Sequence, residues 1–185
     1  MTFLYIPESN WWIIRDKFKS KLPTEVNKTY LKTLLGLTSE GAAQNLMSPL
    51  RRLGLIDDDN KPTDLANIWR NDSRYADACK IMIENTYPQE LRDLFSGNDI
   101  DKDKCQQWFM DTGKLGEAPA RQAATTYIML NEAIPKPATD FLKKPSPKPG
   151  ETSSQKRKRS EKEETKAEKV KTEVASQSLE PFSKI

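Results

Sequence analysis

Residues 41–63 of the chain read GAAQNLMSPLRRLGLIDDDNKPT, and this stretch decides the fold that the sequence predicts. Its first part has the apolar spacing of an amphipathic helix, with Ala43, Leu46, Met47, Leu50 and Leu53 on one face. A glycine, a short apolar pair and a polar turn follow, in the order of the recognition helix and wing of a winged helix-turn-helix. We therefore expect a mainly α-helical chain that contains a winged helix-turn-helix-like unit with a minimal β-hairpin wing.

Helical patterns flank this stretch on both sides. Upstream, apolar residues at helical spacing predict a helix over about 11–21, capped by Asn10, and a second over 27–35, ended by Gly36. Downstream, short amphipathic segments continue to about residue 133. The last two segments are separated by a glycine-containing turn, which is again the order helix, turn, helix. The expected second unit is therefore also small, helical and helix-turn-helix-like.

The composition divides the chain into three parts. We expect a winged-helix-like unit with supporting helices over 1–95 and a helical unit packed on it over 96–142. The remaining residues, 143–185, are rich in Lys, Glu, Ser and Pro and poor in apolar side chains. Such a segment buries too little apolar surface to offset the entropy of ordering, so we expect a disordered charged tail.

The net charge of +3 is distributed unevenly along the chain. Residues 143–185 hold 12 Lys and Arg against 7 Asp and Glu, whereas residues 1–142 hold 18 against 20. Within residues 1–142, the first 56 residues are basic, with 8 Lys and Arg against 4 Asp and Glu. Residues 57–142 are acidic, with 10 Lys and Arg against 16 Asp and Glu. Residues 1–142 therefore lack the general positive charge of a protein that coats nucleic acid.

One face of the predicted helix nevertheless carries side chains suited to DNA. Opposite the apolar stripe lie Gly41, Asn45, Ser48 and Arg52, flanked by Gln44 and Arg51. Their polar and basic members are of the types that hydrogen-bond to base edges and phosphates in a major groove. A basic cluster in the tail adds nonspecific attraction to phosphates: Lys156, Arg157, Lys158 and Arg159. The first functional hypothesis is a DNA-binding or regulatory protein.

Two features favour an alternative hypothesis. Pro49 lies inside the predicted helix and would kink it or split it, with Ser48 as a new N-cap. Asp57, Asp58 and Asp59 occupy the predicted wing tip, where carboxylates would repel phosphates. Trp12 falls off the apolar stripe of its helix and is a candidate anchor for a partner. The alternative is a protein-interaction adaptor or accessory subunit that uses the winged-helix scaffold.

The sequence contains none of the usual catalytic motifs. It has no histidine, which removes the commonest general base and metal ligand, and no glycine-rich phosphate loop. Asp99, Asp101 and Asp103 imitate the start of a calcium loop, but Lys104 stands where that loop needs glycine and Met110 where it needs glutamate. We expect a protein without enzymatic activity, metal or cofactor.

Compartment signals are also missing from the sequence. No apolar run approaches the roughly 18 residues of a membrane span, and the N-terminus does not read as a signal peptide. The two cysteines, Cys79 and Cys105, have neither metal-site nor disulfide-framework spacing. We expect reduced, partly buried thiols in a cytoplasmic protein that does not enter membranes.

Several sequence blocks, in order, resemble a bacterial domain-of-unknown-function family. They are NWWIIRDKFKSKLP, YLKTLLGLTSEGAAQNLMSPLRRLGLIDDDNKPT, WRNDSRYADACKIMIENTYPQELRDLF and WFMDTGKLGEAPARQAATTYIMLNEA. The family motif is approximately LP, G, LRxLGLID, PT, YPxxLRD, G, AR and FYxxL, and the resemblance covers about residues 8–134. It implies a winged-helix-like unit followed by a helical one and a bacterial origin, and it implies no particular reaction.

Overall fold

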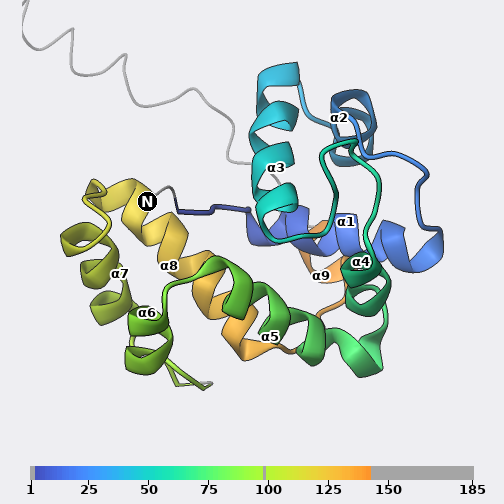
Figure 1. Cartoon of the computed structure of the whole chain (residues 1–185). Helices are drawn as coiled ribbons and strands as arrows, with labels where there is room; N and C mark the ends of the chain where they lie inside the picture. The colour runs from blue at the N-terminus through green and yellow to red at the C-terminus, as the bar shows by residue number, and fades with distance from the viewer. Residues whose placement is uncertain (1–2, 98, 143–185) are drawn as a thin grey trace, which may run out of the picture. The chain divides into compact units, whose positions relative to one another are not determined.

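The computed structural model describes residues 3–97 and 99–142, and within these ranges the chain is mainly α-helical (Figure 1). The described residues belong to one compact unit that spans residues 1–144. The helices are α1 (Glu8–Ser20), α2 (Lys28–Leu35), α3 (Glu40–Arg52), α4 (Asp64–Trp69), the short 3₁₀ helix η1 (Asp72–Arg74), α5 (Tyr75–Thr86), α6 (Gln89–Leu94), α7 (Lys102–Asp111), α8 (Glu117–Glu132) and α9 (Thr139–Leu142). The predicted tail, with its basic cluster at residues 156–159, lies outside the described residues.

Side-chain caps explain where several helices begin. Asn27 accepts a hydrogen bond from the backbone N–H of Tyr30 at 2.9 Å, and Asp101 accepts from two backbone N–H groups at the start of α7. The predicted cap at Asn10 is wrong, because α1 begins at Glu8, directly after Pro7. The carbonyl of Pro7 accepts the first helical hydrogen bond from Trp11 at 3.0 Å, so proline's fixed φ sets the entry to the helix.

A buried cluster of aromatic side chains holds α1 against α4 and α5. Trp69 makes edge-to-face contacts with Trp11 and Phe18, at centroid distances of 4.7 and 5.5 Å. The indole N–H of Trp11 donates to the hydroxyl of Tyr75 at 3.0 Å, whereas the indole N–H of Trp69 is buried without a hydrogen-bond partner in the described structure. Arg15, only 2% exposed, donates to the backbone oxygen of Trp69 at 3.0 Å and lies 4.4 Å from the ring centroid of Tyr75.

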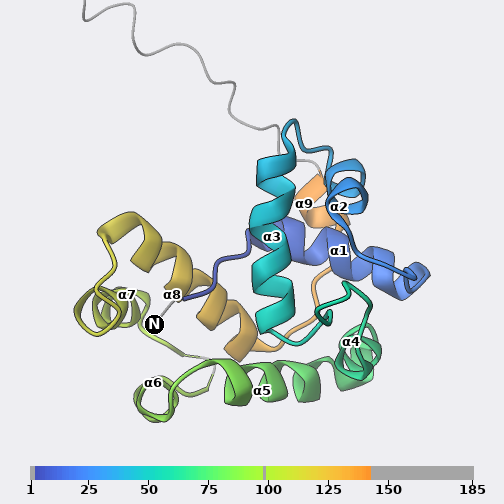
Figure 2. The same cartoon turned by 45° about the horizontal axis from the view of Figure 1, so that its top comes forward.

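The N-terminal segment, residues 3–7, joins the two predicted units. The backbone N–H of Ile6 donates to the hydroxyl of Thr126 in α8 at 3.2 Å. The ring of Phe3 lies edge-on to Phe109 of α7 at 4.8 Å, and Tyr87, directly after α5, contacts Tyr127 of α8 at 4.9 Å. Residues from both sides of the predicted boundary at residue 95 therefore share one hydrophobic core. Figure 2 shows this segment running from beside α8 to the start of α1, which α3 crosses.

Helix α3 runs without interruption through Pro49. The predicted split, with Ser48 as a new N-cap, is not observed, because Ser39 caps the whole helix by accepting from the backbone N–H of Ala42 at 3.2 Å. Pro49 removes the N–H that would bond to the carbonyl of Asn45. Pro49 is itself buried, and this apolar burial offsets part of that loss.

Candidate binding site along helix α3

The turn between α2 and α3 sets the direction of α3. Gly36 ends α2 in the left-handed region, with φ of 61°, a conformation that glycine adopts without a steric cost. The backbone N–H of Leu37 donates to the carbonyl of Lys32 at 3.0 Å, which closes the end of α2. Helices α2 and α3 pack directly against each other. The apolar side of α3 consequently faces the core and its polar side faces outward.

The outward side of α3 carries four of the five residues predicted to contact DNA. Gln44, Asn45, Ser48 and Arg52 are exposed, whereas the apolar residues between them are buried. Among the described residues, the side chains of Gln44, Asn45 and Ser48 form no hydrogen bonds. Their amide and hydroxyl groups are therefore available to a ligand.

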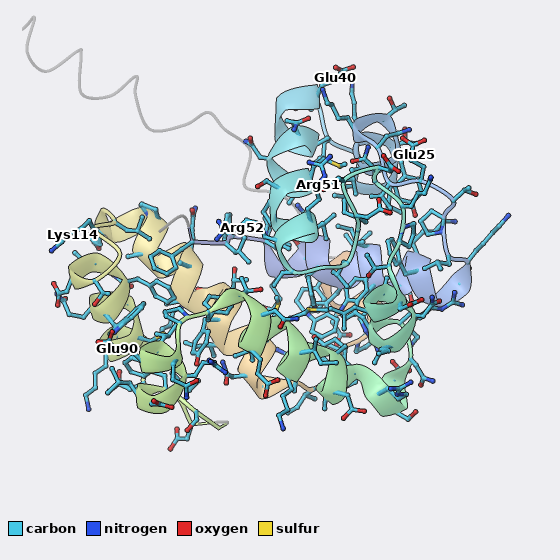
Figure 3. All side chains as sticks on the ribbon, in the orientation of Figure 1. Glu25, Glu40, Arg51, Arg52, Glu90 and Lys114 are labelled. Carbon is cyan, nitrogen blue, oxygen red and sulfur yellow. The ribbon has the colours of Figure 1, made fainter. Side chains whose placement is uncertain are left out.

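The fifth residue, Arg51, has a different role from its neighbour. Its guanidinium donates to the side-chain oxygen of Asn60, so it ties the end of α3 to the following turn. Figure 3 shows Arg51 and Arg52 on different sides of the helix. Asn60 itself has φ of 65°, and its carbonyl accepts from the backbone N–H of Val26 at 2.8 Å. Asn60 is not among the predicted site residues, although Asn in a polar turn before a Lys-Pro pair is a signal for a left-handed backbone.

The predicted wing is a tight turn with one isolated antiparallel bridge, between Ile56 and Pro62. No strand occurs in residues 3–97 or 99–142. Pro62 has no N–H to donate, so the pairing ends there. The turn is closed instead by Asp57, whose backbone N–H donates to the carbonyl of Lys61 and whose carboxylate accepts from the N–H of Lys61, at 2.9 and 2.8 Å.

The wing tip keeps its negative charge at the surface. Asp57, Asp58 and Asp59 are all exposed. The only cation paired with them in the described structure is Lys61, whose ammonium lies 3.7 Å from the carboxylate of Asp59. A surface ion pair of this length contributes little, so the tip remains acidic.

A groove of about 610 Å³ follows the outward side of α3. Residues 3–7 and the start of α1 form its second wall. The lining combines apolar with uncharged polar side chains, and Arg52 is its only charged residue: Phe3, Leu4, Tyr5, Pro7, Asn10, Leu37, Ala42, Gln44, Asn45, Leu46, Ser48, Pro49 and Arg52. The sequence contains no signal for this wall, because nothing in residues 3–7 indicates which helix they lie beside.

A smaller hollow of about 270 Å³ lies at the C-terminal end of α3 and shares Phe3, Leu4 and Arg52 with the groove. Its wall includes Tyr87, which is 4% exposed. Burial raises the pKa of the Tyr87 hydroxyl, and the positive charge of Arg52 offsets part of this rise. The phenol therefore stays protonated and can donate a hydrogen bond at every physiological pH.

Trp12, the predicted partner anchor, lies in the core. Only 1% of its surface is exposed, its indole N–H donates to the carboxylate of Glu8 at 3.3 Å, and its ring stacks on Phe141 of α9. Although the side chain is off the main stripe of α1, it is buried because α9 packs on that side of the helix. Its apolar surface is occupied by contacts within the chain.

The part of the chain that the structure describes contains no group of three or more His, Cys, Asp or Glu residues that could hold a metal ion. In the same residues, no helix has the length and apolar character that a membrane span requires. The groove along α3 combines uncharged hydrogen-bonding groups with apolar walls and the guanidinium of Arg52.

One protein-family model matches the chain. It is described as a family of unknown function (DUF5343), and the match covers residues 11–134. Searches of curated proteins and of solved structures find no match to the chain.

Proposed function

The chain belongs to the family of unknown function DUF5343, and we propose that it is a non-enzymatic winged-helix-type protein that binds DNA through the outward side of α3. In this proposal α2 and α3 are the helix-turn-helix, and the turn at residues 57–61 is a minimal wing. The helix α3 enters the major groove.

The observation that carries the proposal is the unpaired polar face of α3. Gln44, Asn45 and Ser48 are exposed and form no side-chain hydrogen bonds within the described residues. Asn and Gln amides match the adjacent donor and acceptor of adenine in the major groove, and a serine hydroxyl bonds to several base edges. Gln44 and Ser48 are four residues apart, close to one helical turn, so their side chains lie on the same face of α3.

Phosphate contacts are few in this arrangement. Arg52 lies at the C-terminal end of the face, and Lys28 is exposed at the start of α2, where the first helix of such a motif crosses the DNA backbone. The acidic wing tip would stay away from phosphates. Specificity would then come from base contacts on α3, while the basic cluster at residues 156–159 supplies nonspecific attraction.

Selection from a random duplex library followed by mobility-shift titration tests the proposal. The triple variant Gln44→Ala/Asn45→Ala/Ser48→Ala should lose preference for the selected sequence and retain weak binding to random duplex. A matched control is Gln122→Ala, an exposed glutamine on α8. If the library yields no enriched sequence, or if the triple variant binds the enriched sequence as tightly as the unmodified chain, α3 does not read DNA.

A second candidate is the adaptor function, and the apolar wall of the groove favours it. Phe3, Tyr5 and Leu37 line the groove beside α3; Tyr5 is 38% exposed, and the other two are partly exposed. DNA bases would leave these side chains unused, whereas a peptide segment from a partner protein would bury them.

Comparative co-purification separates the two candidates. A protein that binds in the groove should be recovered with the unmodified chain and with Asp58→Asn, and lost with Tyr5→Lys. Equal recovery with Tyr5→Lys would exclude the groove as its docking site. Normal DNA binding by Tyr5→Lys would show that the two functions use different sides of the groove.

A further inference from the structure

Residues 3–7, which form the second wall of the groove along α3, run as a stretched segment whose side chains alternate in burial (Figure 2). Leu4 and Ile6 are 2% and 1% exposed, whereas Tyr5 between them is 38% exposed. A period of two is that of a β-strand. The segment nevertheless pairs with no other strand, since none occurs in residues 3–97 or 99–142. It is therefore a single strand-like segment with two backbone edges.

One backbone edge of this segment is held by α8. The backbone N–H of Ile6 donates to the hydroxyl of Thr126 at 3.2 Å. In an extended segment the backbone N–H and C=O groups of neighbouring residues point in opposite directions. Those of Tyr5 consequently point away from α8. Among the described residues, none from α8 lines the groove, so the edge at Tyr5 is the one on the groove side.

The edge at Tyr5 is not paired within the described structure. Neither its backbone N–H nor its C=O takes part in a hydrogen bond there, and solvent reaches this residue. An extended peptide can add to such an edge by replacing water with its own backbone groups. Phe3 and Leu37 line the same groove and are partly exposed, so a bound peptide would also cover apolar surface.

The charge in the groove limits the composition of such a peptide. Within the described part of the chain, Arg52 is the only charged residue that lines the groove or the smaller hollow at its end. Arg52 is exposed at the C-terminal end of α3 (Figure 3). A carboxylate is favoured beside this guanidinium, because the partly apolar walls weaken screening by water. The complementary peptide therefore has one Asp or Glu among apolar and uncharged residues. Duplex DNA also matches Arg52 in charge, but it offers no apolar side chains to Phe3 and Leu37.

We propose that the groove binds an extended peptide segment of a partner protein, which pairs with the backbone of Tyr5 and places one carboxylate against Arg52. The inference rests on the adaptor function, the second candidate above, and specifies how the partner binds. Alternate side chains of an added strand point to the same side, so every second residue of the peptide contacts the apolar walls.

Selection of short random peptides on the full-length chain supplies the probe. Enriched peptides should repeat apolar residues with a period of two and share one acidic position. Arg52→Gln should weaken the binding of such a peptide roughly fivefold or more and should remove its preference for Asp over Asn. Arg121→Gln, at an exposed arginine of α8 outside the groove, is the matched control and should bind normally. A selection without enriched peptides, or unchanged affinity in Arg52→Gln, would overturn the proposal.

Amide hydrogen exchange of the ¹⁵N-labelled full-length chain tests the backbone pairing. The Tyr5 amide should exchange rapidly in the free chain and much more slowly with a selected peptide bound. The Ile6 amide is the internal control, because it already donates to Thr126 and should change little. Tyr5→Pro removes the N–H and Tyr5→Val keeps it, so the proline variant should bind the peptide several-fold more weakly than the valine variant.

The adaptor function and the backbone pairing fail in different ways. Suppose that a partner is recovered with the unmodified chain and lost with Tyr5→Lys. An unprotected Tyr5 amide, or equal affinities of Tyr5→Pro and Tyr5→Val, would then overturn the backbone pairing and retain the adaptor function. Protection of the Tyr5 amide that rises with protein concentration in the peptide-free chain would assign the edge to a second copy of the chain, and it would overturn peptide binding.

Discussion

The guanidinium of Arg51 donates a hydrogen bond to the side-chain oxygen of Asn60, nine residues later in the chain. Asn60 in turn accepts from the backbone of Val26 through its carbonyl. One short network thus fastens the end of α3, the wing turn and the segment before α2. Arg51, which the sequence presents as a partner of DNA, is occupied within the protein.

This network predicts different roles for the two adjacent arginines: Arg51 stabilises the fold, and Arg52 contacts the ligand. Arg51→Ala should lower the free energy of unfolding by about 1–2 kcal/mol, because it leaves a partly buried acceptor unpaired, and should lower Tm by roughly 3–6 °C. Calorimetry measures both. Asn60→Gly, which keeps the left-handed backbone and removes the acceptor, should have a similar effect. A stable Arg51→Ala that loses DNA binding would show that Arg51 contacts the ligand after all.

Gly113 allows Phe3 to approach the end of α7. A Cβ at this position would lie 2.4 Å from the carbonyl oxygen of Phe109 and 2.5 Å from the ring of Phe3. Gly113→Ala should therefore destabilise the chain by about 2–4 kcal/mol, measured by urea unfolding. The control is Gly116→Ala, where the nearest atom is 3.9 Å away in Pro119. Equal stability of the two variants would mean that the N-terminal segment does not pack here.

The buried Arg15 predicts a pH dependence of stability through Asp72. Hydrogen bonds from Lys19 and Arg15 hold the pKa of the Asp72 carboxyl below its usual range. A carboxyl with a lowered folded-state pKa stabilises the fold above its unfolded pKa, and this stabilisation is lost as the pH falls through the folded pKa. Asp72→Asn should lower stability at pH 7 and bring it closer to that of the unmodified chain below pH ~3. Urea unfolding across this range measures the difference.

A matched variant for this pair is Asp77→Asn. Asp77 lies 3.8 Å from Arg74 in an ion pair at the surface, and both side chains are more than half exposed. Such pairs contribute about 0–1 kcal/mol, so Asp77→Asn should unfold like the unmodified chain at every pH. If Asp72→Asn and Asp77→Asn have the same pH profile, the carboxylate of Asp72 does not stabilise the buried guanidinium.

The few cations near α3 predict a shallow salt dependence of DNA binding. Each neutralised phosphate adds about −0.9 to the slope of log K against log salt. A variant with serine at Lys156, Arg157, Lys158 and Arg159 should show a slope near −2, as expected for Arg52 and Lys28 alone. The unmodified chain should be steeper if the cluster contacts phosphates. Identical slopes measured by fluorescence anisotropy would exclude the cluster from binding.

Both cysteines should be unreactive in the folded protein. Burial raises the pKa of Cys79 and of Cys105 to about 12, and both are fully buried. Their thiolate fraction at pH 8 is therefore very small, and a thiol reagent cannot reach the buried sulfur atoms. A thiol assay with a coloured disulfide reagent should detect no rapidly reacting group in the folded chain and two after denaturation. A fast-reacting thiol in the native chain would reveal local opening around α5 or α7.

Local sequence signals determined most of the secondary structure. The apolar spacing in residues 41–53, the caps at Asn27, Ser39 and Asp101, and the glycine after α2 all act over a few residues, so the sequence contains them in full. The predicted cap at Asn10 was wrong, because Pro7 starts the helix earlier. The predicted split at Pro49 was also wrong, because Ser39 caps the whole of α3 and the helix continues through the proline.

Only the tertiary structure decided what each side chain of the candidate site does. The sequence places Arg51 and Arg52 next to each other, but the bond to Asn60 requires the turn to fold back on α3. The sequence also leaves Trp12 without a partner, whereas α9, more than a hundred residues later, covers it. Helical periodicity gives the exposed face of an isolated helix; contacts between segments far apart in the chain determine which of those exposed side chains remain available.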